Sequence, residues 1–203
     1  MTFEKISFKK RHVYFIIFNL IALPALFFLS RQVIALREKT PEKPLTVYGT
    51  LRPFELTSHT GKRFGLEHMK NRVWVANFMF SHCPNECPAM NFKIGLLQES
   101  LGKEAGFLSF SVDPEKDTPA VLQDYAKRFN AKEDVWFFLT GPKTVISRIL
   151  EDCHFADAED PLLHGLRLVL LDDKGQVRGY HDYSDPFLIK NLTHAIQLLK
   201  EKG

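Results

Sequence analysis

The sequence predicts an α/β fold with a central mixed sheet covered by helices on both faces. Apolar, β-rich runs alternate with amphipathic stretches from residue 72 onward. Turn or capping residues separate the runs from the stretches. A short turn, Asp172–Gly175, joins the last two β-rich runs, so we expect these two strands to be antiparallel. Alternation of this kind is typical of a layered sheet with helices on its faces.

The expected strands are short runs rich in apolar and β-branched residues, at 72–80, 106–112, 135–139, 166–171 and 176–180. The expected helices are the amphipathic stretches at 89–101, 118–129, 143–152 and 185–200. A helix start is predicted where Thr118 precedes Pro119, because threonine caps a first turn and proline suits its first position.

The chain has 203 residues, of which 45% are hydrophobic. A domain of about 160 residues builds a sufficient core without disulfides, so we expect its cysteines to serve chemistry and not stability. The net charge of +3 is unevenly distributed, because the first 40 residues hold seven of the 27 Lys/Arg and two of the 24 Asp/Glu. The remainder is close to neutral. We therefore predict no nucleic-acid binding, which would require a basic surface.

An uncharged and mostly apolar run at residues 13–30 lies between Arg11 and Arg31. As a helix it would be about 27 Å long, close to the thickness of a membrane core. It predicts a transmembrane anchor, and the basic tail 1–12 favours a cytoplasmic N-terminus. The alternative is a signal peptide cleaved near Val33–Ala35. Both place the body outside the cytoplasm, and we predict a single-pass protein of the bacterial inner membrane whose C-terminal domain lies in the periplasm.

The anchor is followed by a predicted linker at residues 31–48. Its stretch REKTPEKPLTV is polar and contains two prolines, which is typical of a spacer between a membrane and a domain. Residues 49–203 form the predicted globular domain.

The stretch FMFSHCPNECPAM, residues 78–90, places Cys83 and Cys87 at the end of the strand predicted for 72–80. Pro88 suits the first position of the helix that follows. A helix N-terminus exposes backbone N–H groups and lowers thiol pKa values, which favours the thiolate form. Two such thiols can close a disulfide or hold a soft metal, and their spacing alone leaves both chemistries open.

Three motifs resemble those of the Sco/SenC family, whose members are membrane-anchored, thioredoxin-like copper proteins that help assemble the copper centre of cytochrome c oxidase. FMFSHCPNECPAM resembles the signature F-x-x-T-H-C-P-D-x-C-P. FSVDPEKDTPAVLQDYAKRF, residues 110–129, is similar to the family's S-V-D-P-x-x-D-T-P stretch. HGLRLVLLDDKG, residues 164–175, resembles a segment in which His begins a strand that ends in Asp and Gly. The resemblance covers roughly residues 50–200.

The resemblance implies a thioredoxin-like fold with a central mixed sheet flanked by helices, preceded by one N-terminal transmembrane helix. It makes Cys83, Cys87 and His164 the ligands of one copper ion, Cu(I) or Cu(II), and such a soft donor set suits copper. The implied function is a metallochaperone for the dinuclear copper centre of cytochrome c oxidase, with the copper-binding oxidase subunit as partner. The alternative is a thiol:disulfide oxidoreductase with Cys83 and Cys87 as a redox-active pair, which reduces the oxidase cysteines or other exported disulfides and is itself served by a thiol reductase.

The chain departs from the family pattern beside its predicted ligands. Asn85 stands where Asp is usual, and Glu86 stands where an aliphatic residue is usual. Leu163 precedes His164 where Asp is common, which removes an acceptor for the imidazole. These changes predict an altered copper affinity.

Other side chains with ligand chemistry lack a matching motif. His82 is expected beside the metal site without being a ligand, and Met90 is expected in the core. Cys153 is expected to be a partly buried free thiol. Asp113 and Asp117 are expected to serve as loop and cap residues.

Overall fold

The computed structural model describes residues 20, 22–24, 46–155 and 167–202. The chain divides into two compact units, Met1–Pro44 and Leu45–Gly203. Within the described residues, no helix is both long and apolar enough to cross a membrane. Apart from residues 20 and 22–24, the predicted tail 1–12, the predicted anchor 13–30 and the predicted linker as far as residue 45 lie outside the described residues.

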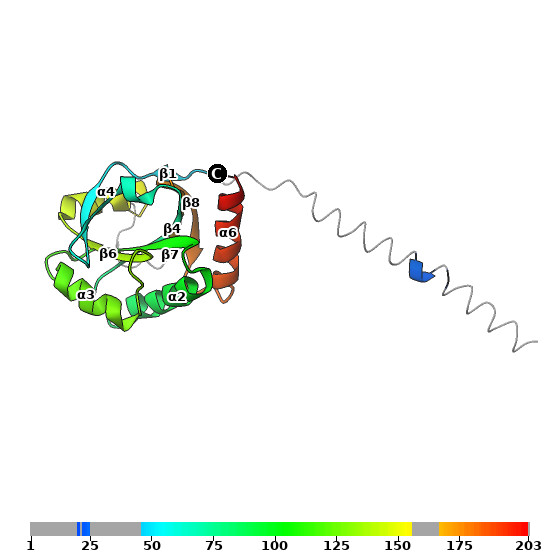
Figure 1. Cartoon of the computed structure of the whole chain (residues 1–203). Coiled ribbons are helices and arrows are strands. Elements are labelled where there is room, and N and C mark those ends of the chain that lie inside the picture. The colour runs from blue at the N-terminus through cyan, green and yellow to red at the C-terminus, as the bar shows by residue number, and fades with distance from the viewer. Residues whose placement is uncertain (1–19, 21, 25–45, 156–166, 203) are drawn as a thin grey trace, which may run out of the picture. The chain divides into compact units, whose positions relative to one another are not determined.

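Among the described residues, eight strands form one mixed sheet in the order β1-β8-β7-β4-β5-β6-β2-β3 (Figure 1). Strands β4, β5 and β6 are parallel, whereas β7 is antiparallel to both β4 and β8. The predicted antiparallel pairing of the last two strands is therefore confirmed. The strands are β1 Gly49–Thr50, β2 Glu55–Ser58, β3 Arg63–Gly65, β4 Val73–Met79, β5 Ala105–Ser111, β6 Trp136–Thr140, β7 Arg167–Leu171 and β8 Gln176–Asp182.

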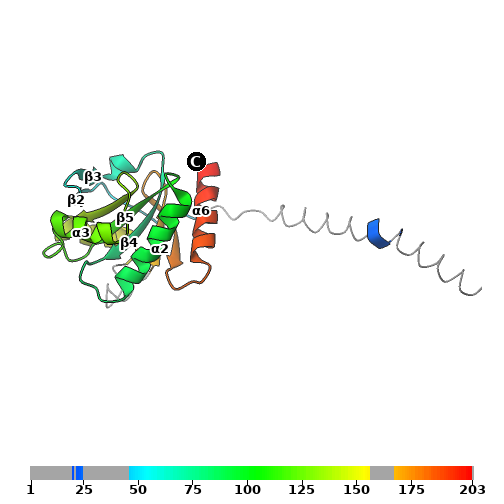
Figure 2. The same ribbon diagram turned by 60° about the horizontal axis from the view of Figure 1, so that its bottom comes forward.

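Helices cover both faces of this sheet (Figures 1 and 2). Helices α2, α3 and α6 pack on one face around one hydrophobic core, and α4 packs on the other face around a second core. The predicted α/β fold is confirmed. The helices described in this unit are the 3-10 helix η1 Leu66–Met69 and the α-helices α2 Glu86–Leu101, α3 Pro119–Arg128, α4 Lys143–Asp152 and α6 Leu188–Lys202.

Strand β4 carries the chain through the centre of the sheet to the cysteine segment. All seven of its residues are buried, as expected for a strand covered on both faces. Its alternate apolar side chains enter the two cores, Val73, Val75 and Met79 on the α2 side, and Trp74, Ala76 and Phe78 on the α4 side. The strand is thereby fixed from both faces just before the cysteines.

Two features of the fold differ from the sequence prediction. Strands β1 to β3 and η1 were not predicted. Helix α2 begins at Glu86, and Pro88 is its third residue, not its first. Proline is tolerated there because the first four N–H groups of a helix have no acceptor within it. The first intrahelical bond follows directly, from the Ala89 N–H to the Asn85 carbonyl at 3.2 Å.

Candidate metal centre

The structure brings Cys83 and Cys87 together where β4 hands over to α2. Cys83 lies in the turn after β4, where its N–H donates to the Phe80 carbonyl at 3.2 Å. Cys87 lies in the first turn of α2, and its backbone N–H donates to Cys83 Sγ at 3.4 Å. Both thiols are free of disulfides, and the residues are 9% and 7% exposed. A pair of reduced thiols therefore lies just below the surface at a helix N-terminus.

The Cys87 thiol is far less acidic than the sequence predicted. Burial raises its pKa to about 12, and a hydrogen bond with Cys83 adds to the increase. The expectation that the helix N-terminus lowers this pKa is wrong, because the loss of water around a buried thiolate outweighs the backbone N–H groups. Cys87 thus rests as a thiol at neutral pH, and a bound metal must displace its proton.

A carboxylate lies beside the thiol pair. The Cys83 thiol donates to Glu86 Oε2 at 3.9 Å, and the negative charge of Glu86 contributes to the raised pKa of Cys87. Glu86 is exposed and is the first residue of α2. The site therefore contains an oxygen donor at a position where the resemblance leads us to expect an aliphatic side chain.

Asp117 anchors the segment that precedes Cys83. Its buried carboxylate accepts from the Ser81 N–H at 3.1 Å, the Ser81 hydroxyl at 2.5 Å and the Ser111 hydroxyl at 2.6 Å. The sequence predicts only a loop or cap role for Asp117, so this anchoring role is seen only in the structure. The available signal was topological, because residues that follow two adjacent parallel strands meet at one edge of the sheet.

A chain of buried polar groups attaches α2 to the sheet below it. Asn77 of β4 donates to Asn91 of α2 at 2.9 Å, and Asn91 donates to the Tyr125 hydroxyl at 3.3 Å. Ser109 donates to Asn77 at 2.7 Å and accepts from the Trp136 ring at 2.9 Å. Such fully satisfied networks specify one packing arrangement. They fix the helix that carries Cys87 relative to the strand that leads to Cys83.

The other side chains with ligand chemistry make contacts of their own within the fold. His82 Nε2 lies 3.4 Å from Asp113 Oδ2, and the His82 ring packs on Phe80. Met90 is 1% exposed and lies in the core below α2, as expected. Cys153 is fully buried, not partly buried, and its thiol pKa is raised to about 12 by burial. It belongs to the core on the other face of the sheet, so the sheet separates it from the dithiol.

The third predicted ligand, His164, lies outside the described residues, which omit 156–166. Within the part that the structure describes, no group of three or more His, Cys, Asp or Glu side chains is placed to hold a metal. The two described thiols fit a soft metal by their chemistry and their mutual contact.

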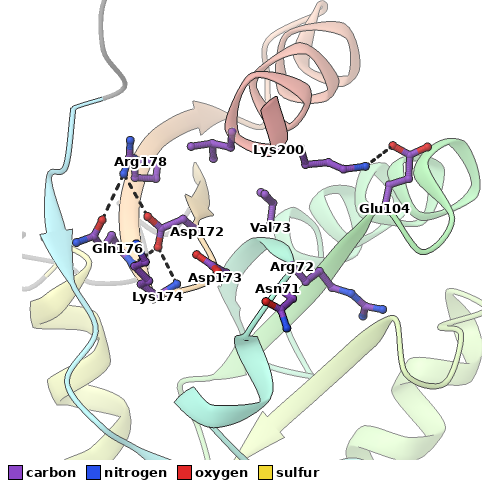
Figure 3. Close-up of a pocket in the computed structure, with 11 residues that line it drawn as sticks. Asn71, Arg72, Val73, Glu104, Asp172, Asp173, Lys174, Gln176, Arg178 and Lys200 are labelled. Carbon is purple, nitrogen blue, oxygen red and sulfur yellow. Dashed lines mark hydrogen bonds and ion pairs between the residues drawn. The ribbon is translucent and has the colours of Figure 1, made fainter. Parts of the chain in front are cut away.

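A surface cavity of about 370 Å³ lies at the opposite end of β4, beside Arg72 and Val73 (Figure 3). Two ion pairs lie in its lining. Asp172 accepts from Arg178 at 3.2 Å and from two backbone N–H groups of its own turn, and Lys200 pairs with Glu104 at 2.9 Å. These contacts close the β7–β8 turn and join α6 to the loop that follows α2.

A mixed sheet covered by helices, with two adjacent thiols where a central strand meets a helix, defines a dithiol protein of thioredoxin-like fold. The chain belongs to the SCO1/SenC family, whose model matches residues 43–199.

Relatives and solved structures agree with this assignment. The SCO1 protein homolog of Bacillus subtilis is 39% identical over 94 residues, which are 45% of this chain and about half (49%) of that relative. A SCO1/SenC family lipoprotein from Bacillus anthracis is 28% identical with a TM-score of 0.65, over 74% of this chain and 95% of the other. BsSco, a Sco-family cytochrome c oxidase assembly protein with a disulfide switch, is 25% identical with a TM-score of 0.68, over 78% and 98%.

A copper-bound member of this fold has also been solved. Bradyrhizobium japonicum ScoI with copper bound is 22% identical to this chain, with a TM-score of 0.59, over 74% of this chain and 99% of ScoI. At that identity the likeness shows a shared fold.

Proposed function

We propose that this protein is a metallochaperone that binds one copper ion through Cys83, Cys87 and His164 and passes it to the copper-binding subunit of cytochrome c oxidase. The observation that carries the proposal is the pair of reduced thiols in contact at the end of β4. Two thiolates are soft ligands of the kind that select Cu(I). Copper bound by ScoI and oxidase assembly by BsSco support the same assignment here.

The pairing of β7 with β4 supports His164 as the third ligand. Val169 of β7 lies opposite Ala76 of β4 in an antiparallel register. The start of β7 at Arg167 therefore lies at the same edge of the sheet as the end of β4. His164 precedes Arg167 by three residues, which span at most about 11 Å. This connectivity supports the proposal that His164 can reach the edge at which the thiols lie.

The chain's own residues would act in a defined order during loading. Asp117 holds Ser81, so the segment that carries Cys83 is fixed before copper arrives. Cys83 and Cys87 each release a proton as the metal binds, and the high pKa of Cys87 makes loading more favourable at higher pH. Delivery requires an incoming pair of thiols to replace Cys83 and Cys87 one at a time, since a three-ligand site leaves room for an entering ligand.

A second candidate function is thiol:disulfide exchange, which the Cys87 N–H to Cys83 Sγ contact favours. This N–H can stabilise a thiolate that develops on Cys83, whereas burial keeps Cys87 protonated. Cys83 would attack a target disulfide and form a mixed disulfide. Cys87 would then lose its proton and attack Cys83, which releases the reduced target and leaves a Cys83–Cys87 disulfide. A separate thiol reductase would return the pair to the dithiol.

We propose that residues 13–30 anchor the protein in the bacterial inner membrane, with the tail 1–12 in the cytoplasm and residues 31–48 as the spacer. The domain 49–203 would then lie in the periplasm, where an oxidase subunit can receive copper. The B. anthracis relative is a lipoprotein, so attachment to a membrane has a precedent in the family. Protease added to spheroplasts should digest the domain; protection of the domain in spheroplasts would exclude this topology.

Variants of the full chain test the copper site. His164→Ala should bind copper at least about tenfold more weakly than the parent chain, as expected for a lost ligand, while it still forms the Cys83–Cys87 disulfide on oxidation. His194→Ala is the matched control, because His194 is exposed on α6. Equal copper affinity in all three proteins would exclude His164 as a ligand.

A further inference from the structure

Another surface cavity, of about 450 Å³, lies beside the start of β4 and is lined in part by side chains of the second core. Its volume falls within the roughly 300–1,000 Å³ of small-molecule pockets. The lining contains one acidic residue, Asp134, and four positively charged residues, which are Lys62, Arg63, Lys70 and Arg72. Because the chain beyond residue 40 is close to neutral, this cavity concentrates positive charge.

Three of these cations are not neutralised by a carboxylate. Arg63 pairs with Glu55 at 3.3 Å, whereas Lys62, Lys70 and Arg72 form no ion pair among the described residues. Three cations against the one acid of the lining leave an excess of two positive charges. A phosphate monoester carries about −1.5 to −2 charges at neutral pH, so it balances this excess, which a single carboxylate does not.

The Arg72 guanidinium is already held in place. Its Nη1 donates to the Asp134 carbonyl at 2.7 Å, and its central carbon lies 5.4 Å from the centre of the Trp74 ring. Figure 3 shows the side chain extended away from Asp172 and Asp173 of the neighbouring cavity. Arginine has five N–H donors, so one hydrogen bond leaves donors for the bidentate contact that phosphate accepts.

Aromatic side chains supply a surface for an organic group. The rings of Phe64, Trp74 and Phe137 contact one another, and Phe137 is only half-buried. The exposed His68 ring stacks on Phe64 at 5.2 Å. Its Nδ1 accepts from the Gly65 N–H at 3.0 Å, so the neutral ring carries its proton on Nε2, which is a further donor for an anion.

Protection of a sheet edge does not account for all of these cations. Arg63 lies on the edge strand β3 and Lys62 directly precedes it, where charged residues discourage pairing with another chain. Lys70 and Arg72 lie between η1 and β4, outside that strand. We propose that the cavity binds an organic phosphate, with Lys62, Lys70 and Arg72 on the phosphate group. The phosphate belongs either to a soluble compound or to an anionic phospholipid headgroup, and the test separates these two sources.

The soluble source is tested by calorimetric titration of the full chain, in nonionic detergent, with phenyl phosphate. The variants are Arg72→Gln and Lys70→Gln, which each remove one charge. Arg128→Gln is the matched control, because the Arg128 guanidinium also lies over a ring, 5.7 Å from the centre of Tyr125 on α3. Benzoate, which puts a carboxylate on the same ring, tests the preference for phosphate.

The lipid source is tested with the full chain in phosphatidylcholine nanodiscs, with and without phosphatidylglycerol. Acetylation of Lys62 and Lys70 is measured by mass spectrometry. Lys143 is the control lysine, because it is exposed and lies at the start of α4.

We expect Arg72→Gln and Lys70→Gln to bind phenyl phosphate at least about tenfold more weakly than the parent chain, which should also bind benzoate at least about tenfold more weakly. Arg128→Gln should match the parent. A headgroup as the source predicts that phosphatidylglycerol slows acetylation of Lys62 and Lys70 at least about twofold, as for a site that is half occupied or more, with Lys143 unchanged. A soluble source predicts no such protection.

The inference would be overturned by either of two results. One is phenyl phosphate binding that is absent, or equal in the parent and the Arg72 and Lys70 variants, together with no protection by phosphatidylglycerol. The other is equal protection of Lys62, Lys70 and Lys143, which would show attraction to the lipid surface without a site.

Discussion

Removal of the Asp117 carboxylate should destabilise the protein and also weaken its metal site. The Ser81 and Ser111 hydroxyls each donate to this buried group, at 2.5 and 2.6 Å. A hydrogen bond to a charged group contributes about 1.5–3 kcal/mol, so Asp117→Ala should lower the free energy of unfolding by about 3–6 kcal/mol. Asp117→Asn keeps one acceptor oxygen and its amide can donate to a rotated hydroxyl, so its cost should be about half, roughly 1.5–3 kcal/mol.

Urea denaturation of the copper-free protein measures this cost, and copper competition measures its effect on the site. Because Ser81 lies two residues before Cys83, copper affinity should fall about tenfold or more in Asp117→Asn. Asp113→Asn is the matched control, since Asp113 pairs near the surface with His82 and Lys116 and should cost less than about 1 kcal/mol. Unfolding free energies for both Asp117 variants within about 0.5 kcal/mol of the parent would refute the role of this carboxylate.

Two further predictions concern buried side chains away from the site. Burial lowers the pKa of His59, whose Nδ1 accepts from the Phe138 N–H at 3.3 Å, so the folded state disfavours its protonation. Stability should therefore be retained above about pH 6.5 and fall below it, with His59 contributing up to about 1.4 kcal/mol per pH unit; a pH series of urea denaturation in which His59→Gln has the same slope as the parent would contradict this. Cys153 is fully buried with its thiol pKa raised to about 12, so iodoacetamide should alkylate it only after unfolding. Mass spectrometry that found Cys153 modified in the folded protein would disprove its burial.

The central part of the fold could be predicted from sequence because its elements are long and strongly patterned. The seven buried residues of β4 and the Thr118–Pro119 start of α3 are local signals of this kind. Strand β1 has two residues and β3 has three, too few for a periodicity to be recognised. They are strands because neighbouring strands supply hydrogen-bond partners, which no local pattern reveals.

The residue types of the site could be predicted from the sequence, whereas the pKa of Cys87 and the role of Asp117 could not. The motif identified Cys83 and Cys87, and the structure places them in contact. The pKa of Cys87 could not be predicted, since it depends on how deeply the packing of α2 buries the thiol. The role of Asp117 also required the tertiary structure, because its partner Ser81 is 36 residues away. Glu86 departs from the family pattern in the sequence, and the structure shows that its carboxylate lies beside the Cys83 thiol.

The most direct test of the copper site is X-ray absorption spectroscopy at the copper edge of the reduced full chain loaded with one equivalent of Cu(I). Two sulfur ligands and one imidazole nitrogen are predicted, with the nitrogen lost in His164→Ala. A first shell with a single sulfur, or with no nitrogen in the parent chain, would contradict the assignment of Cys83, Cys87 and His164 as the copper ligands.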